Sequence, residues 1–172
     1  MKAALTIVSG GQTGVDRAAL DAALEAGVPC GGWCPAGRLD EHGVIPARYP
    51  LRELPGGDFA ARTLKNVQDS DATALICFGP PEGGTEQTRL FCLAEKKPHL
   101  LLDALVLTPQ EAVARLEAFL RRQRIRRLNV AGPRASKEPR AYPFAFVVLS
   151  ALLARHRADD LEKGRKGQHE RP

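Results

Sequence analysis

The amino-acid sequence predicts an α/β fold in which one doubly wound parallel sheet of about five strands carries helices on both faces. Apolar runs alternate with amphipathic stretches along the chain, which is the pattern of a parallel sheet covered by helices. Glycine-rich turns follow several of the apolar runs, as they do where a strand leads into a helix. The length of 172 residues suits one ordinary domain.

Five strands are predicted where apolar residues run together. The first, third and fourth in chain order are nearly continuous apolar runs, as expected of strands that are buried on both faces. Glycines weaken the second, because they leave it few side chains to pack. The five predicted strands are 4–8, 29–32, 72–78, 99–103 and 127–131.

Five helices are predicted to alternate with these strands. Thr108, Pro109 and Glu111 form the pattern of a capping box with proline in the first helical position, so the start of the fourth helix is the best-defined boundary. Residues 144–153 are apolar nearly all round, which indicates deep packing or a subunit interface and favours a dimer or tetramer. The predicted helices are 15–26, 58–69, 85–96, 109–124 and 141–155.

Two stretches fall outside the alternating pattern. Residues 32–57 contain repeated prolines and glycines without periodicity, and a long irregular loop of this kind is expected to form a wall or lid over a functional site. The apolar pattern stops after Arg155. We therefore expect a ligand-binding domain at 1–155 and a basic, disordered tail at 156–172.

Composition narrows the class of protein. An apolar fraction of 44% with 26% charged residues is typical of a packed globular protein. No apolar run reaches the roughly 18 residues of a spanning helix and no signal peptide begins the chain, so we expect a soluble, cytoplasmic protein without membrane contact. The net charge of +5 is concentrated in the tail and in arginines at 121–127, and only 5% of residues are aromatic, which disfavours nucleic-acid binding. The four scattered cysteines indicate reduced thiols rather than a disulfide framework or a zinc site.

The segment from Ser9 to Asp16 carries the strongest functional signal, a glycine turn between an apolar strand and a helix. Its glycines allow the backbone to approach a ligand, and the unpaired N–H groups at the helix start attract an anion, most often a phosphate. The turn lacks the lysine of a Walker loop, which disfavours triphosphate hydrolysis, and its glycine order gives little support to a dinucleotide cofactor. The predicted ligand-binding residues of this turn are Gly10, Gly11, Gln12, Thr13, Gly14 and Asp16.

A second glycine turn follows the predicted strand 72–78. Gly83 and Gly84 free the backbone there, and Thr85 is placed to cap the helix that follows. If the strand order is 2-1-3-4-5, both turns meet at the carboxyl edge of the sheet and hold one polyanionic ligand. Three arginines are candidates for contacts to its phosphate or carboxylate groups, namely Arg38, Arg62 and Arg134.

Asp16 has two interpretations. As an early helix residue it complements the helix dipole, and as a cleft residue it accepts a hydrogen bond from a ribose hydroxyl or a base N–H. Because a carboxylate repels phosphate, Asp16 is expected to face the sugar or base end of a ligand.

Several motifs occur in a fixed order along the chain. They are GGQTGVDRAALD at 10–21, GWCPAGR at 32–38, Arg62-Thr63 with Asn66-Val67 and Ser70-Asp71, Gly83-Gly84-Thr85 with Thr88, and LNVAGPR at 128–134. With these motifs the chain resembles the molybdenum-carrier proteins, a circularly permuted YpsA-like branch of the SLOG superfamily of Rossmann-like nucleotide-ligand binders. The resemblance covers residues 4 to about 153.

This resemblance implies a Rossmann-like fold and a protein that binds a small molecule. The implied ligand is a phosphorylated pterin such as the molybdenum cofactor, or a nucleotide-derived molecule, with Thr88 among the binding residues. We find no set of protein ligands for a metal ion, and a binding protein is favoured over an enzyme.

The alternative is a nucleoside-monophosphate N-glycosidic hydrolase. LOG-type phosphoribohydrolases of the same superfamily carry a P-G-G-x-G-T-x-x-E motif whose glutamate assists cleavage. Thr88 stands where that glutamate is expected, so hydrolysis here would depend on Glu82 or Glu86.

Overall fold

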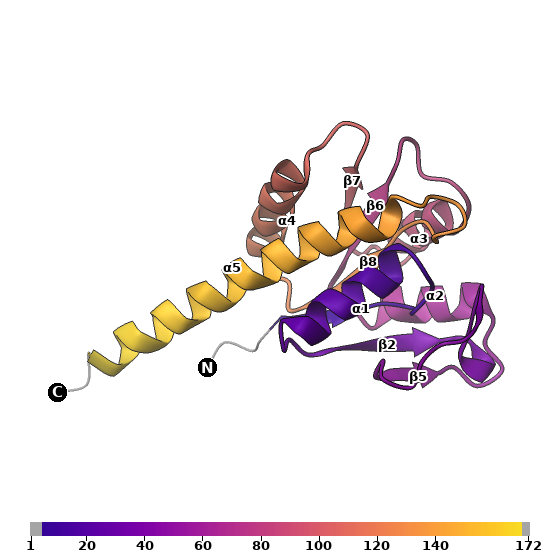
Figure 1. Ribbon diagram of the computed structural model, residues 1–172, viewed down its shortest axis with the longest axis horizontal. Helices are drawn as coiled ribbons and strands as arrows, with labels where there is room; N and C mark the ends of the chain where they lie inside the picture. Colours follow the sequence, from indigo (N-terminus) through magenta and orange to yellow (C-terminus); the bar gives the residue numbers. More distant parts are fainter. Residues whose placement is uncertain (1–4, 170–172) are drawn as a thin grey trace.

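Six parallel strands form the central sheet of the protein, which a computed structural model describes over residues 5–169, with side chains to residue 158 (Figure 1). Every strand pair in this sheet is parallel. The predicted α/β fold class is confirmed. In spatial order the strands are β5 (Leu51–Glu53), β2 (Cys30–Cys34), β1 (Thr6–Val8), β8 (Arg127–Ala131), β6 (Ala72–Cys77) and β7 (His99–Asp103).

The strand order differs from the predicted 2-1-3-4-5. Strand β8 lies between β1 and β6, where Leu128 is the partner of Ile7 on one side and of Ala72 on the other. This central position explains why β8 is buried at Leu128, Asn129 and Val130. Apolar periodicity reports burial but does not report which neighbour a strand has, so the order could not be derived from it.

The sixth strand, β5, lies inside the stretch that was predicted to be irregular. Leu51 pairs with Gly32 at the edge of the sheet. Three residues are too few to show a period-two pattern, which is why the strand was missed. The same stretch also contains a one-turn 3₁₀ helix at Ala36–Arg38 and a two-stranded antiparallel hairpin of β3 (Leu39–Asp40) and β4 (Gly43–Val44).

Helices cover both faces of the sheet, as Figure 1 shows. The helices α1 (Val15–Glu25), α4 (Pro109–Gln123) and α5 (Ala141–His169) bury their apolar residues in one shared core. The opposite face carries α2 (Phe59–Gln68) and α3 (Gly83–Ala94). None of the helices described in residues 5–169 is long and apolar enough to cross a membrane.

The capping box predicted for α4 is present. The Thr108 hydroxyl accepts a hydrogen bond from Glu111 N at 3.3 Å, and the Glu111 carboxylate accepts one from Thr108 N at 2.8 Å. Two of the unpaired donors at the helix start are thereby satisfied.

The apolar run in α5 is explained by packing within the chain. Val148, Leu149 and Leu152 are fully buried against the core shared with α1 and α4. The predicted dimer or tetramer is therefore not needed to cover them, and it stays a prediction. The helix also continues beyond Arg155, where we expected disorder, and extends away from the body in Figure 1. Good helix formers such as Ala, Leu, Glu, Lys and Arg allow this extension, and the boundary at 155/156 stays a prediction.

Two truncations in α5 test whether its buried face stabilises the domain. Leu149→Ala removes a fully buried side chain and should lower the free energy of unfolding by about 2–5 kcal/mol. Val147→Ala is the matched control, because Val147 is 50% exposed and its loss should change stability by about 0.5 kcal/mol or less. Urea unfolding followed by circular dichroism measures both, and equal losses would contradict the described packing.

Candidate ligand-binding cleft

A cleft of about 510 Å³ opens at the carboxyl ends of β1, β8 and β6. This volume lies within the range of small-molecule sites in proteins, roughly 300–1,000 Å³. Four segments supply its lining residues, namely 10–16, 59–66, 77–88 and 129–138. The carboxyl edge of an open parallel sheet is where ligands bind in α/β proteins, so this cleft is the candidate site.

The cleft brings together most of the predicted ligand-binding residues. Both glycine turns reach it although β8 lies between their strands, because the ends of parallel strands share one edge. The predicted residues that line it are Gly10, Gln12, Asp16, Arg62, Gly83, Gly84, Thr85, Thr88 and Arg134, together with Glu82 of the hydrolase alternative. The predicted residues outside the lining are Gly11, Thr13, Gly14, Arg38 and Glu86.

The first glycine turn binds the carboxylate of Asp16. The carboxylate of Asp16, only 5% exposed, pairs with Arg62 Nη1 at 3.2 Å and accepts a hydrogen bond from Gln12 N at 3.4 Å. Burial raises the pKa of Asp16, while the Arg62 charge and the backbone N–H groups of Gln12 and Gly10 oppose the rise. The N–H groups that could have held a ligand's phosphate thus hold a side-chain carboxylate.

Two glycines in this turn are required by close approach. A Cβ on Gly10 would lie 1.5 Å from Arg62 Nη1, so a larger residue there would displace the guanidinium from its observed position. Gly14 has φ of 75°, and a Cβ there would lie 2.3 Å from the carbonyl oxygen of Pro133. That carbonyl accepts the hydrogen bond of Val15 N at 3.2 Å, which uses one of the first N–H groups of α1.

The second glycine turn is open to the cleft. Glu82 is the N-cap of α3, and among the residues that the structure describes no side chain caps this helix. No heavy atom approaches within 4 Å of a Cβ built on Gly83 or Gly84. The Thr88 hydroxyl is used within the helix, where it donates to the carbonyl of Gly84 at 2.7 Å. Gly83 and Gly84 are exposed at the start of α3, which carries the positive end of a helix dipole, whereas Thr85 N already donates to the Glu82 carbonyl at 3.1 Å.

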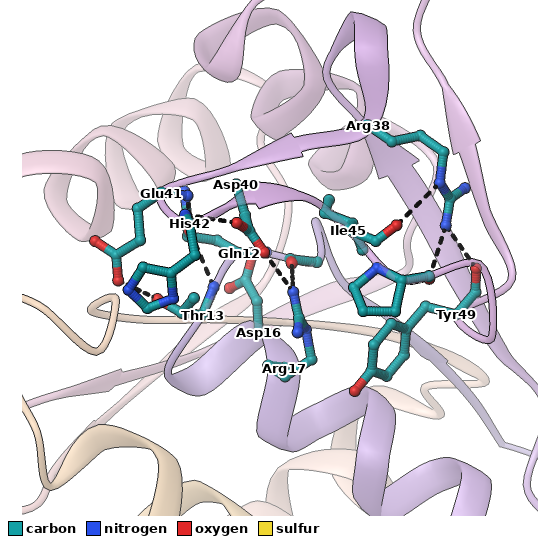
Figure 2. A network of polar contacts seen from close by, with 12 residues as sticks. Gln12, Thr13, Asp16, Arg17, Arg38, Asp40, Glu41, His42, Ile45 and Tyr49 are labelled. Atoms are coloured by element: carbon teal, nitrogen blue, oxygen red, sulfur yellow. Dashed lines mark hydrogen bonds and ion pairs between the residues drawn. The ribbon is translucent and has the colours of Figure 1, made fainter.

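Arg38 is not among the residues that line the cleft, and Figure 2 shows its side chain beside Ile45 and Tyr49. Its guanidinium donates to the backbone carbonyls of Ile45, Pro46, Tyr49 and Leu51, at 2.8 Å for Leu51. These carbonyls accept from four of the five N–H donors of the guanidinium, so Arg38 organises residues 45–51.

Residues of the stretch 32–57 contact segments next to the cleft but do not line it. Glu41, in the turn between β3 and β4, accepts hydrogen bonds from the hydroxyls of Thr13 and Ser136, and Thr13 adjoins it in Figure 2. Arg17 pairs with Asp40 at 2.6 Å and lies over the ring of Tyr49. None of residues 32–57 is among those lining the cleft, so the expectation of a wall or lid is wrong.

Several lining residues were not among the predicted ligand-binding residues, and four of them are Asn129, Asn66, Phe59 and Lys137. Asn129 could have been found, because it is a buried polar residue inside an apolar strand, where its amide nitrogen donates to Thr73 Oγ1 at 3.2 Å. Asn66 fixes α2 to β2 by exchanging two hydrogen bonds with the backbone of Trp33. Phe59 and Lys137 gave no distinguishing signal, because an exposed aromatic or lysine is common on any surface.

The cleft has no thiolate nucleophile. Cys77 is one of its lining residues, and burial raises the pKa of this thiol to about 11. The thiol is therefore protonated at neutral pH and unreactive.

The chain is similar to known proteins both in sequence and in structure. The chain matches the sequence profile of the circularly permutated YpsA SLOG family over residues 7–153. It is also similar to a crystal structure named "Putative molybdenum carrier protein", from Syntrophus aciditrophicus SB, with 43% sequence identity and a TM-score of 0.85. That match covers 88% of this chain and 96% of the other. No curated protein matches the chain.

Removing Arg62 should expose the cost of burying Asp16. In Arg62→Met the carboxylate loses its countercharge, so the already raised pKa of Asp16 rises further. When an acidic group has a higher pKa in the folded than in the unfolded state, the protein becomes less stable as the pH rises toward the folded-state pKa. We expect the free energy of unfolding to fall by about 3–5 kcal/mol at pH 8, and by less at pH 5, because a raised pKa makes protonation of Asp16 more favourable as the pH falls.

Urea unfolding at the two pH values measures this difference. The double variant Asp16→Asn/Arg62→Met should recover part of the loss and abolish its dependence on pH. A loss in Arg62→Met that is the same at pH 5 and pH 8 would show that the two side chains are not coupled.

Proposed function

Because the chain belongs to the circularly permuted YpsA family of SLOG proteins, we propose that it binds a phosphorylated pterin or a nucleotide-like small molecule in this cleft. The family and the similarity to a molybdenum carrier structure support a ligand-binding or carrier role. The phosphorylated pterin of the proposal is similar to the molybdenum cofactor. Binding rather than catalysis is the role that the residues of the cleft support best.

The open N-terminus of α3 is the observation that carries this proposal. Gly83 and Gly84 are exposed and line a concave site at a helix start without a side-chain cap, and such a helix start binds a phosphate through hydrogen bonds and its dipole. Lys137 and Arg134 line the same cleft and add positive charge from the loop after β8.

The charges of the cleft favour a ligand with few phosphates. Hydrogen bonds from Arg140 lower the pKa of Glu138 to about 2, so this lining residue is ionised at neutral pH. The lining holds as many acidic as basic side chains, which disfavours a triphosphate that would need a strong excess of cations. The basic residues are Arg62, Arg134 and Lys137, and the acidic residues are Asp16, Glu82 and Glu138.

Other lining residues suit a flat heterocycle. Phe59 is 48% exposed at the cleft and offers an aromatic face for stacking. Asn129 and Asp16 also line the cleft, where their polar groups are nearly buried and are paired with Thr73 and Arg62 respectively. A pterin and a purine both present such rings, and this similarity is why the proposal keeps both classes.

The hydrolase alternative has less support. Of its two candidate acids, Glu82 lines the cleft, whereas Glu86 pairs with Arg89 at 2.6 Å and lies outside the lining. If the alternative holds, nucleoside monophosphates will release free base, and Glu82→Gln will abolish the release while Glu86→Gln will not. Chromatography of a nucleotide panel after long incubation tests this, and the absence of any released base would exclude the alternative.

The variant Gly84→Val tests the proposed binding site. The residue lies in a helix with open space where a side chain would point, so the protein should fold while the added methyl groups block the N–H groups. Affinity for a pterin phosphate or a nucleoside monophosphate should fall at least about tenfold, the equivalent of one charge-assisted hydrogen bond or more. Isothermal titration calorimetry, with native mass spectrometry of the purified protein, measures the binding.

Ala118→Val provides the matched control. Ala118 is exposed on α4, away from the residues that line the cleft, and the substitution adds a β-branched side chain to a helix in the same way. Unchanged affinity in the control and lost affinity in Gly84→Val is the expected pair of results. Equal affinity in wild type and Gly84→Val would rule out α3 as the anion site.

A further inference from the structure

Two consecutive acidic residues fix the β3–β4 hairpin to the rest of the protein. Asp40 and Glu41 both have nearly buried side chains, with exposed fractions of 5% and 10%. They hold different partners, as Figure 2 shows for Asp40 beside Arg17 and Glu41 beside Thr13. Asp40 anchors the hairpin to α1, whereas Glu41 reaches the loop that follows β8.

Glu41 gathers four donors around one carboxylate. Its oxygens accept from the hydroxyls of Thr13 and Ser136 and from Ser136 N at 3.1 Å, and they pair with Arg134 Nε at 3.4 Å. Burial opposes ionisation of Glu41, but these hydrogen bonds and the Arg134 charge outweigh it and lower the pKa. The carboxylate is therefore ionised at neutral pH, and it can hold all four groups at once.

The Glu41 carboxylate contacts the loop from Pro133 to Glu138 through Ser136 and Arg134. Ala135 N donates to Thr13 Oγ1 at 3.0 Å, so the loop is also joined to the first glycine turn. Thr13, Glu41 and Ser136 lie outside the lining of the cleft, whereas Arg134 and Lys137 lie within it. Arg134 therefore contacts Glu41 and also lines the cleft, and Lys137 belongs to the same loop.

We propose that Glu41 is a positioning residue for ligand binding, which holds the loop after β8 so that Arg134 and Lys137 face the anion site at α3. This inference rests on the proposed function, because it concerns the same cleft. A loop that is already ordered loses little entropy when the ligand binds, and preorganisation of this kind strengthens binding without a direct contact.

The experiment compares two variants that each release one anchor of the hairpin. Glu41→Gln weakens the hold on the loop after β8, and Asp40→Asn weakens the hold on α1, so both should reduce stability. Inorganic phosphate is the probe, and ¹H–¹⁵N spectra report its binding at the amides of Gly83 and Gly84. We expect the dissociation constant to rise about tenfold in Glu41→Gln and less than about twofold in Asp40→Asn.

A third variant distinguishes positioning from a loss of overall structure. Ser136→Ala removes one donor to Glu41 without altering the lining of the cleft, so it should weaken phosphate binding too. The double variant Glu41→Gln/Ser136→Ala should be no weaker than Glu41→Gln alone, because both changes break the same contact. Hydrogen exchange at the amides of Ala135 and Ser136 should become faster in Glu41→Gln.

The outcomes separate the two proposals. If phosphate shifts no α3 amide in the wild-type protein, the proposed function fails at its anion site. If phosphate binds wild type and Glu41→Gln equally, or if Asp40→Asn weakens binding as much as Glu41→Gln, Glu41 has no positioning role although the site stands.

Discussion

The buried carboxylate of Asp16 inside the first glycine turn is the interaction on which the rest of the site depends. It faces Arg62 at 3.2 Å and is bound by backbone N–H groups of the same turn. A second anion placed there would meet an existing negative charge in a nearly buried position, which is strongly unfavourable. The sequence of this turn is typical of phosphate binding, but in this protein the turn binds the carboxylate of Asp16. The proposed anion site therefore lies at the start of α3, where a Cβ on Gly83 or Gly84 would meet open space.

The strand order determines which loop packs against the first glycine turn. Because β8 lies beside β1, the loop after β8 passes directly over the first turn, and Pro133 accepts the hydrogen bond of Val15 N. Gly14 is needed at that crossing, since a side chain there would meet the Pro133 carbonyl. The β3–β4 hairpin contacts both segments through Glu41, which accepts hydrogen bonds from Thr13 and Ser136. The first glycine turn and the loop after β8 are thus fixed by contacts with residues outside the cleft lining, as the loops of a preorganised site are.

Much of this arrangement could be predicted from the sequence. Strand and helix patterns depend on local periodicity, and the capping box at Thr108 depends on three neighbouring residues, so both were accessible. The meeting of the two turns followed from their positions after parallel strands. The role of Arg38 could not be predicted, because its four carbonyl partners come from a loop without periodicity. Strand order, the pairing of Asp16 with Arg62 and the reach of Glu41 to Ser136 join residues distant in the chain, and local patterns do not report such contacts.

The most direct test locates an anion in the cleft. Arsenate mimics phosphate and scatters X-rays anomalously, so a crystal soaked in arsenate reports the position of the bound anion without reference to the rest of the ligand. Anomalous density beside the backbone N–H groups of Gly83 and Gly84, on the side facing Lys137, is the predicted result. Density within the turn from Gly10 to Gly14, with Arg62 displaced from Asp16, would contradict it.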